Sequence, residues 1–559
     1  MHVLGINSWL HDSAVALFRE GELVAAIEEE RWYRDDKHTS EFPRRSIEFC
    51  LRQAGGPAQI EHVAINLNTK AAYGDAGKML ARLDKANQRD AKHLRRSIKL
   101  SERGVRQTLR SKGTSGDFTF HEVAHHDAHA ASTFFLSPYE EAAVLTLDGR
   151  GEWATTTSYH GRGNRLERVN TIGLPHSLGS VYAAVTEYLG FLRNNDEYKV
   201  MGLASYGDPS RFKAQMDRLV RPTEGGFEVN LEHFEEQARV LFAGEGLVKL
   251  FGQPRRVRES ELEQVHKDLA AALQQRTEEI GLHLARQLHT RTEAKHLCMA
   301  GGVALNCVMN TRILAETEFE SIYVQPAAYD AGGALGAAAW VNHQILGMPR
   351  TFVMNRPNFG PEYGDAEIEQ VLSAGLLRYR KVEDPALAAA ELIAEGKIVG
   401  WFQGRAEFGP RALGYRSILA DPSQPHMQDH VNARVKHRES FRPFAPSTTL
   451  ESFREVFDTE AEDPFMTTVI PVREEFRARL PAITHVDGTA RMQTVRKELN
   501  PLYHRLISEV GRLRGLPIVL NTSFNVRGEP MVLSPKDALR CFFTTGLDHL
   551  VLGSFVVDK

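Results

Sequence analysis

Two groups of residues in this 559-residue chain have the types and spacing that chemistry requires. In the first group, His125 and His129 are four residues apart in the alanine-rich stretch 124–132, so a helix would present both imidazoles on one face. Two imidazoles on one face can grip a single metal ion. Asp330 heads a glycine-rich run and could add a carboxylate; Asp148 is a weaker candidate, because Asp-Gly pairs are often plain turns. The sequence therefore predicts a metal site.

The identity of the metal stays open at this point. A zinc-protease motif is excluded, because His126 rather than a glutamate follows His125. Two imidazoles with one or two carboxylates suit a borderline divalent metal such as Fe(II), Mn(II) or Zn(II). The structural alternative is a buried histidine kept for packing, which is the usual role of a lone histidine and fits a spaced pair less well.

The second group is a set of basic residues in the last third of the chain, in segments otherwise rich in Gly, Pro and Phe. Guanidinium forks match phosphate and carboxylate oxygens, so the set predicts a pocket for anions. Three polar residues follow an apolar strand expected at 517–520 and could bind an amide or a phosphate, or simply form a polar turn. The basic residues are Arg411, Lys436, Arg438, Arg442 and Arg491, and the polar residues are Asn521, Ser523 and Asn525.

Strands and tight turns must position the first group. Strands are expected at 3–7, 14–18 and 23–27, and the same strand-turn-strand-turn-strand pattern recurs at 143–147, 154–159 and 166–172. Such a repeat predicts a duplicated domain whose turns hold nucleotide phosphates, the layout of actin-like and sugar-kinase-like ATPases. A further strand at 297–300 runs into Gly301-Gly302 and then a helix, a place where backbone closely approaches a ligand.

We expect an α/β protein of two domains. Residues 1–345 form the duplicated domain, 346–362 a linker with prolines and glycines, and 363–559 a second α/β domain. In the second domain, a helix is expected at 386–394 and strands at 398–402 and 549–557. The basic stretch 78–112 predicts a pair of amphipathic surface helices or, alternatively, a lid over an acceptor pocket.

Composition narrows the setting. A formal net charge of −4 and a pI near 6.7 give no global reason to expect nucleic acid as a partner. Four scattered cysteines form no disulfide framework. No signal sequence or membrane-spanning apolar stretch is evident, so we expect a cytoplasmic protein that does not enter a membrane.

The first group resembles the metal and nucleotide site of the universal tRNA threonylcarbamoyl-transferase subunit, on His125, His129, Asp330 and the run 301–306. A longer series of motifs, in the same order along nearly the whole chain, is similar to the NodU/CmcH family of O-carbamoyltransferases, which includes antibiotic-tailoring enzymes. No shared motif covers 78–112. The residues that carry this resemblance are 11–14 (HDSA), 28–31 (EEER), Lys37, His38, 201–207 (MGLASYG), and the blocks around Arg411, Lys436 and Asn521.

The resemblance implies an activity and roles. The second domain, similar to the YrdC-like fold, would make carbamoyl adenylate from carbamoyl phosphate and ATP. The first domain would transfer the carbamoyl group to a hydroxyl of a small molecule, with Fe(II) in its metal site and Mg²⁺ accompanying ATP. The implied catalytic residues are His11, Lys37, Arg411, Lys436 and Arg491; the metal ligands are His125, His129, Asp148 and Asp330; and the nucleotide-binding residues are Lys199, Gly301, Gly302, Asn306, Asn310, Gly332 and Gly333.

Several alternatives remain. His11 is a candidate general base, because a neutral imidazole can accept a proton near pH 7, but it could equally cap a turn. A threonylcarbamoyl-type tRNA-modifying enzyme would share both folds and needs a basic RNA-binding face, which only 78–112 offers. A non-catalytic nucleotide-binding sensor or assembly protein would explain the first domain but would give no function to the basic residues in the last third of the chain. The acceptor and the oligomeric state are not indicated.

Overall fold

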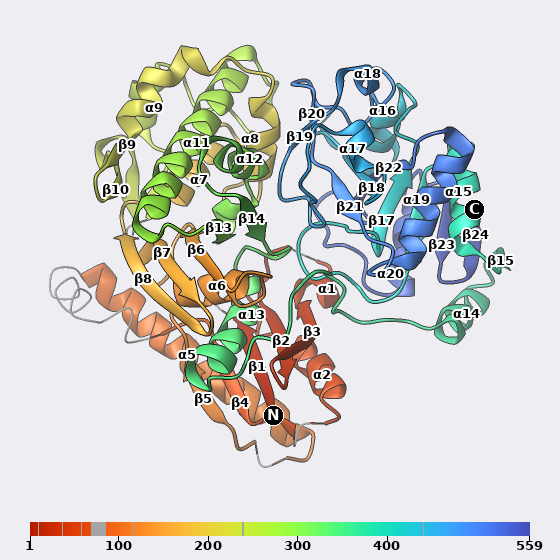
Figure 1. Ribbon diagram of the computed structural model, residues 1–559, viewed down its shortest axis with the longest axis horizontal. Coiled ribbons are helices and arrows are strands. Elements are labelled where there is room, and N and C mark those ends of the chain that lie inside the picture. The colour runs from red at the N-terminus through yellow and green to blue at the C-terminus, as the bar shows by residue number, and fades with distance from the viewer. Residues whose placement is uncertain are drawn as a thin grey trace. The chain divides into compact units, whose positions relative to one another are not determined.

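The chain folds into two compact units in the computed structural model (Figure 1). The first unit comprises residues 1–29 and 38–354, and the second comprises residues 30–37 and 355–559. The described residues are 1–8, 11–35, 37–56, 59–68, 85–114, 116–237, 240–439 and 441–559.

Two five-stranded sheets with the same topology form the framework of the first unit. The sheets have the orders β3-β2-β1-β4-β5 and β8-β7-β6-β13-β14. In each, an antiparallel meander is extended by two parallel strands. The predicted duplication and its actin-like, sugar-kinase-like layout are confirmed. The strands are β1 His2–Asn7, β2 Ala14–Arg19, β3 Glu22–Glu28, β4 His62–Ile65, β5 Thr119–Glu122, β6 Glu141–Leu147, β7 Ala154–Arg162, β8 Arg165–Gly173, β13 His296–Ala300 and β14 Ser321–Val324.

Two short helices pack on these sheets and on each other. Helix α6, His125–Phe134, lies on β6, β7 and β13, and helix α13, Gly332–Ala339, lies on β1, β2 and β4. Their contact is very close: a Cβ built on Gly336 of α13 would lie 1.7 Å from the carbonyl oxygen of Ala128 in α6. Only glycine fits there. This helix pair carries the first group of predicted site residues, so its spacing sets the geometry of that site.

We expect Gly336→Ala to destabilise the first unit. At an exposed helix position, replacing glycine by alanine adds up to about 1 kcal/mol of stability. Here the added methyl group meets backbone, which cannot rotate away, so the expected result is a loss of about 1–3 kcal/mol. Thermal unfolding of the purified protein measures it. Gly225→Ala is the control, because a Cβ there has no neighbour within 4 Å; equal melting temperatures for both variants would contradict the packing argument.

The remaining elements of the first unit cover the sheets or form an insertion between β8 and β13. The long helix α11 packs against α8 and α12 and contacts β6. These elements are α2 Arg44–Gln53, α7 Leu178–Tyr188, α8 Glu197–Ala204, η2 Pro209–Phe212, α9 Lys213–Leu219, β9 Val220–Thr223, β10 Gly226–Val229, η3 Leu231–His233, β11 Glu235–Gln237, β12 Val240–Phe242, α10 Glu245–Phe251, α11 Gln264–Thr292, η4 Gly302–Leu305, α12 Cys307–Glu316 and η5 Trp340–Ile345.

The basic stretch differs from the expectation of two helices. Its described part is a single helix, α5, Lys85–Ser111, and residues 78–84 lie outside the described residues. Gly104 does not break the helix; it makes room for the ring of Phe42, which lies 2.7 Å from where its Cβ would be. Leu94 and Ile98 are buried against Ile65 of strand β4 and against Leu67, which follows that strand. The helix is therefore amphipathic, as predicted, and its apolar stripe is docked on the sheet.

The second unit is built on one eight-stranded mixed sheet of order β15-β24-β23-β16-β17-β22-β18-β21 (Figure 1). It is an α/β domain, as expected. Its strands are β15 Tyr379–Lys381, β16 Val399–Phe402, β17 Arg416–Ala420, β18 Ala445–Thr449, β21 Gln493–Val495, β22 Ile518–Ser523, β23 His549–Leu552 and β24 Phe555–Asp558, with the small pair β19 Ile470–Pro471 and β20 Thr489–Ala490. Its helices are α1 Glu30–Tyr33, α14 Asp365–Ala374, α15 Pro385–Ala394, α16 Met427–Val431, η6 Asn432–Lys436, α17 Phe453–Val456, α18 Glu474–Arg477, α19 Pro501–Arg514 and α20 Pro535–Thr544.

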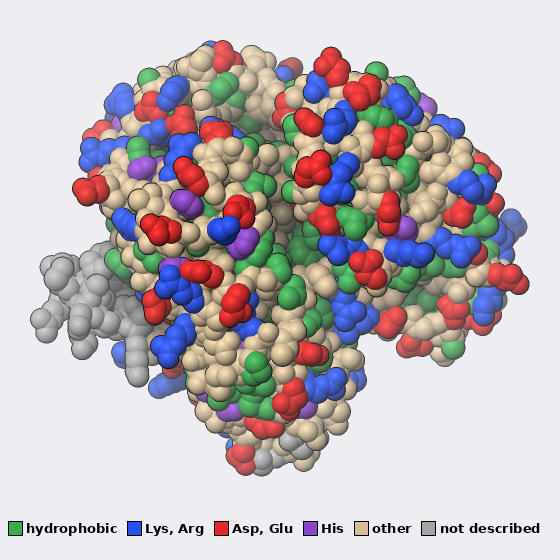
Figure 2. Space-filling model, viewed as in Figure 1, with side chains coloured by type: hydrophobic (Ala, Val, Ile, Leu, Met, Phe, Trp, Pro, Cys, Tyr) green, Lys and Arg blue, Asp and Glu red, His purple; other side chains and the backbone are tan. Residues whose placement is uncertain are grey.

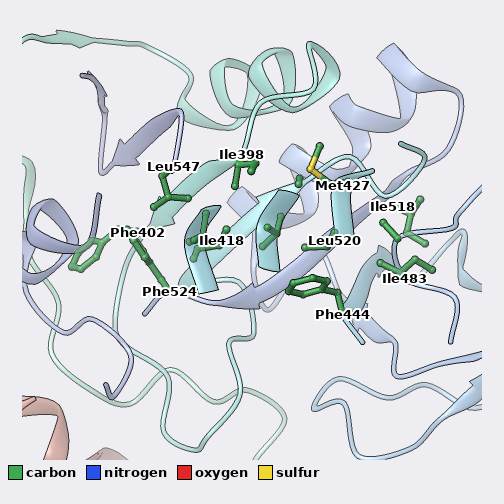
Figure 3. Packing of buried hydrophobic residues seen from close by; sticks show 14 of the residues in the cluster. Ile398, Phe402, Ile418, Met427, Phe444, Ile483, Ile518, Leu520, Phe524 and Leu547 are labelled. Carbon is green, nitrogen blue, oxygen red and sulfur yellow. The ribbon is translucent and has the colours of Figure 1, made fainter. Parts of the chain in front are cut away.

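Both faces of this sheet are buried, because its central strands carry consecutive apolar side chains that point to opposite faces. In β22, Ile518 and Leu520 join one core, and Val519 joins the other beneath α15 and α19. Figure 3 shows the first core, where Phe444 and Phe524 lie among the aliphatic side chains. These two phenylalanines anchor the segments that carry predicted site residues.

Two strand predictions need correction. The stretch 549–557 is a hairpin of two strands, β23 and β24, because Gly553 adopts a φ of 57° and lets the chain reverse. Asn521 and Ser523 do not follow a strand but belong to β22. They pair there with Leu419 and Ser417 of β17. The strand reaches this far because β22 is central in the sheet and is hydrogen-bonded on both sides, to β17 and to β18.

Residues 30–37 come early in the chain yet belong to the second unit. Arg31 donates through Nη2 to the Gly409 carbonyl at 2.5 Å. Arg34 donates through Nη1 to the Pro530 and Met531 carbonyls, at 3.1 and 2.8 Å. Both arginines are buried. This segment therefore brings Lys37 into the same unit as Lys436.

The face of the molecule shown in Figure 2 has no large patch of like-charged side chains among its described residues. Acidic and basic side chains are interspersed over the described residues there. Of the helices in the described part of the chain, none has both the length and the apolar character needed to cross a membrane.

Candidate active sites

Four side chains converge in the first unit to form what we call the metal cluster: His125, His129, Asp148 and Asp330. The two histidines lie in the first two turns of α6, Asp148 follows β6, and Asp330 precedes α13. One ligand atom from each lies within 4.8 Å of all the others, and all four residues are buried. His125 Nε2 is 3.2 Å from Asp148 Oδ2 and 3.5 Å from Asp330 Oδ1. The predicted ligands are thus brought together in one group that could hold a metal ion.

The spacing of the imidazoles fits ligands of a common ion. The two Nε2 atoms are 3.0 Å apart. Ligand nitrogens at about 2.1 Å from an ion lie about 3.0 Å apart at a 90° angle and about 3.4 Å apart at a tetrahedral angle. The observed separation matches the former, which suits a site with more than four positions, such as two histidines with a carboxylate on one face.

Electrostatics favour a bound cation in the cluster. Burial alone would raise the pKa of Asp148, but hydrogen bonds and charge from His125 and His129 outweigh it and hold the pKa well below its usual value. Conversely, burial would lower the pKa of His125, and the carboxylates of Asp330 and Asp148 raise it instead. A divalent cation would replace protons on the imidazoles as the partner of both carboxylates.

Backbone and side-chain groups around the cluster orient its ligands. Asp148 Oδ1 accepts from the Gly302 amide at 2.9 Å, which turns Oδ2 toward His125. Gly301, with φ 92°, passes so close to β6 that a Cβ would lie 2.2 Å from the Leu147 carbonyl oxygen. Glu152 accepts from the His125 amide at 3.1 Å and so caps α6. Glu152 was not predicted; its only sequence signal is its place in the 148–152 turn.

The other predicted nucleotide-binding residues lie in different places. Asn306 caps α12 and exchanges two hydrogen bonds of 3.0 Å with Gln274. Asn310, buried in α12, donates to the Ala304 carbonyl at 2.8 Å. Lys199, on α8, pairs with Asp196 at 3.0 Å.

The glycines that follow Asp330 are packed tightly against neighbouring residues. A Cβ on Gly332 would meet the Ala327 carbonyl oxygen at 2.1 Å, and one on Gly333 would meet the Asn66 side chain at 2.3 Å. Packing against backbone therefore requires glycine at position 332, whereas a side chain at position 333 would force Asn66 to move.

His11 lies at the edge of the metal cluster. Its Nδ1 is 2.6 Å from Asp12 Oδ2 and 3.7 Å from Asp330 Oδ2, and 36% of its side chain is exposed. Burial would lower the pKa of His11, but Asp330 and Asp12 outweigh that effect and raise the pKa to about 10. A cation bound to Asp330 would neutralise the main source of this rise.

Lys436 is the centre of the second candidate site. It is buried, with 4% of the residue exposed, and its ammonium donates to Asn525 Oδ1 at 2.8 Å, Ser523 Oγ at 3.2 Å and the Ser523 carbonyl. Burial lowers the pKa of Lys436 well below its usual value, and the charges of Arg438, Lys37 and Arg442 lower it further. No carboxylate among the described residues forms an ion pair with it. Of the predicted polar residues, Ser523 and Asn525 contact Lys436 directly.

The predicted arginines surround the Phe444 segment. Arg438 lies over the Phe444 ring, 4.4 Å from its centroid, and donates to Asn432 Oδ1 at 2.7 Å. Arg442 is 3.6 Å from Glu439. Burial lowers the pKa of His485, and Arg491 lies close enough to lower it further; that histidine is hydrogen-bonded to the Phe444 backbone. Within the described chain, no carboxylate pairs with Arg491. A buried lysine and an unneutralised arginine favour an anionic ligand.

Asn521 and the loop of Arg411 are joined by hydrogen bonds. Asn521 Nδ2 donates to the Ala412 carbonyl at 3.1 Å, next to half-buried Arg411. Glu407, missed in the sequence, organises this loop: its Oε1 accepts from the amides of Leu413, Tyr415 and Arg416 at 3.0 to 3.1 Å. An acidic residue just before a Gly-Pro-Arg loop was the available signal.

The first unit combines duplicated sheets with a buried group of four possible metal ligands, and the second unit is an α/β domain in which a buried lysine lies near arginines. A family model described as "Carbamoyltransferase N-terminus" matches residues 2–339, and a second one, described as "Carbamoyltransferase C-terminus", matches residues 390–559. The chain therefore belongs to the carbamoyltransferase family and is an enzyme of that class. This result favours carbamoyl transfer over a non-catalytic sensor.

Relatives agree with this assignment. An uncharacterized protein of Synechocystis sp. is 41% identical over 100% of this chain and 97% of the relative. Nodulation protein NolNO of Sinorhizobium fredii is 41% identical over 99% of this chain and 80% of its own. A 3'-hydroxymethylcephem-O-carbamoyltransferase of Amycolatopsis lactamdurans is 30% identical over 78% of this chain and 80% of its own.

Proposed function

We propose that the protein is an ATP-dependent O-carbamoyltransferase that makes carbamoyl adenylate in the second unit and uses it in the first. The observation that carries the proposal is Lys436, a buried ammonium with oxygen ligands and neighbouring cations but no carboxylate partner in the described chain. A buried positive charge without an opposite charge is costly, and a bound anion would stabilise it. Carbamoyl phosphate and ATP, the substrates implied by the resemblance, supply anions of the right kind.

The first half-reaction has two steps. Water cleaves carbamoyl phosphate to carbamate and phosphate; a carbamate oxygen then attacks the α-phosphorus of ATP, and pyrophosphate leaves. Lys436, Arg491 and Arg411 would bind the phosphates and offset the charge that develops on the leaving oxygens. Lys37, Arg438 and Arg442 would add positive charge around them, while Asn521, Ser523 and Asn525 would orient the carbamoyl amide. Carbamate decomposes readily in water, so forming the adenylate in the same pocket protects it.

The second half-reaction transfers the carbamoyl group in the first unit. The acceptor hydroxyl oxygen attacks the carbamoyl carbon, AMP leaves with the bonding electrons, and the hydroxyl proton passes to His11 as general base. Gly301 and Gly302, with Gly332, Gly333, Asn306, Asn310 and Lys199, would hold the adenylate. His125, His129, Asp148 and Asp330 would bind a divalent metal, Fe(II) in our proposal, which supplies Lewis-acid polarisation of the carbamoyl group when bound.

The acceptor is proposed to be a hydroxyl group of a small molecule. The cephem relative is named for a hydroxymethyl acceptor, and a primary alcohol is therefore the first class to test. Membranes and nucleic acids are not part of the proposal, and Mg²⁺ would accompany ATP.

Pyrophosphate release tests this function directly. We expect the purified protein, given ATP, Mg²⁺ and carbamoyl phosphate, to release pyrophosphate, and to release none when either substrate is omitted. Adding a panel of primary alcohols that includes 3'-hydroxymethylcephem should yield a carbamate ester, detected as a mass increase of one carbamoyl group. Pyrophosphate release that ignores carbamoyl phosphate would refute the proposed donor.

A further inference from the structure

We propose that His38 is a positioning residue for carbamoyl transfer: through Asp12, it holds His11 in the tautomer that can accept the proton of the acceptor hydroxyl. This inference rests on the proposed function, which makes His11 the general base. His38 itself need not touch the substrate. All three residues belong to the first unit, and the carboxylate of Asp12 joins the two imidazoles.

The carboxylate of Asp12 is shared symmetrically between the two rings. Its Oδ2 lies 2.6 Å from His11 Nδ1, and its Oδ1 lies 2.6 Å from His38 Nδ1. Asp12 is buried, with 5% of the residue exposed, whereas about a third of each imidazole side chain is exposed. Burial would raise the pKa of Asp12, but the two histidines outweigh it and lower the pKa. Asp12 therefore stays an acceptor of two hydrogen bonds.

The backbone is held in an uncommon conformation to make this arrangement. Asp12 has φ 57° and His38 has φ 59°, both in the left-handed region that residues other than glycine seldom occupy. Asn7 Nδ2 clamps the turn by donating to the His11 and Asp12 carbonyls, at 3.1 and 2.7 Å. The Ser13 amide donates to the Thr39 carbonyl at 3.0 Å, which joins the two segments. Strain that surrounding bonds maintain in this way is typical of functional sites.

The chemical consequence concerns the free nitrogen of His11. An ionised carboxylate only accepts hydrogen bonds, so the His11 nitrogen facing Asp12 must carry a proton. Neutral His11 then has its lone pair on Nε2, which is the atom able to take a proton. The His11 ring also lies 3.7 Å from Asp330 of the metal cluster, so the base sits beside the proposed reaction centre.

Losing His38 would leave Asp12 Oδ1 buried with no donor from that side chain. The carboxylate could then rotate or take up a proton, and after either change neutral His11 could carry its proton on either nitrogen. A glutamine at position 38 has an amide N–H that can replace the imidazole donor but cannot carry a proton. The positioning role therefore predicts that His38→Gln works and His38→Ala does not.

The experiment compares His38→Ala, His38→Gln and wild-type full-length protein. We expect AMP release from synthetic carbamoyl adenylate, with glycerol as hydroxyl probe, to fall about 10- to 100-fold in His38→Ala through kcat rather than KM, and to return to within several-fold of wild type in His38→Gln. Pyrophosphate release in the second unit should be unchanged in both. His38→Gln as inactive as His38→Ala, or His38→Ala as active as wild type, would overturn the proposal.

A second readout does not depend on turnover. Nitrogen-15 NMR of the histidine side chains, recorded at a pH where His11 is neutral and with the His11 signals assigned by their loss in His11→Gln, should show one tautomer in wild type and His38→Gln and averaged signals in His38→Ala. An unaltered His11 tautomer in His38→Ala would overturn the proposal. If wild-type protein consumes no carbamoyl adenylate, the proposed function fails, and this NMR comparison still decides the role of His38.

Discussion

His129→Ala should lose its metal and its carbamoyl transfer activity while staying folded. The two imidazoles have their Nε2 atoms 3.0 Å apart and reach the same pair of carboxylates, so removing one destroys the chelate. Loss of even an outer-shell partner costs about 10- to 100-fold in metal affinity, and a direct ligand should cost more. Metal content after dialysis, measured by mass spectrometry, should fall to background, and transfer from supplied carbamoyl adenylate should be undetectable.

The neighbouring His126 provides a matched control. It is also buried in α6, but its nitrogens bond to Thr146 Oγ1 at 2.7 Å and to the Ala154 carbonyl at 3.0 Å, away from the cluster. His126→Asn should therefore retain its metal, even if it melts at a lower temperature. A His129→Ala protein with wild-type metal content and turnover would refute the site assignment.

Lys436→Ala and Arg491→Ala should stop pyrophosphate release that depends on carbamoyl phosphate. Each variant removes a cation with no carboxylate partner in the described chain, so the interaction that is lost is the one with the anionic substrate. A charge-assisted hydrogen bond contributes about 1.5–3 kcal/mol, and removing a donor that acts in the transition state costs about 10²- to 10³-fold in kcat. A coupled pyrophosphate assay measures the loss.

Arg380→Ala is the control for a change in overall charge. Arg380 lies exposed on the edge strand β15, so its removal should leave pyrophosphate release near the wild-type rate. Wild-type rates in Lys436→Ala and Arg491→Ala would show that the adenylate is formed elsewhere.

Local patterns explain which parts of the first unit could be predicted from sequence. The alternation of apolar strands and tight turns repeats, and the two five-stranded sheets share one order because the same pattern folds twice. The prediction of a helix that carries both His125 and His129 is confirmed, because the alanines in this stretch favour a helix. Asp330 could be proposed because it heads a glycine-rich run, and Asp148, as a weaker candidate, because it begins a turn at the end of a strand.

Contacts between distant segments explain what could not be predicted. Residues 30–37 join the second unit through Arg31 and Arg34, whose partners lie some 380 to 500 positions further along the chain, at Gly409 and Pro530 to Met531. No periodicity marks such a contact. The assignment of Asn521 and Ser523 to a loop failed for a related reason: their polar side chains suggest a turn, but pairing of β22 on both sides keeps the strand going.

Supplying synthetic carbamoyl adenylate to the variants tests the central claim, that one unit makes the adenylate and the other uses it. In parallel, pyrophosphate release and carbamate ester formation would be measured for wild type, Lys436→Ala and His129→Ala, with and without added adenylate. We predict that adenylate restores ester formation in Lys436→Ala to near the wild-type rate, and that His129→Ala releases pyrophosphate but forms no ester under either condition. Loss of both activities in both variants, with no rescue by adenylate, would contradict the account and indicate a single composite active site.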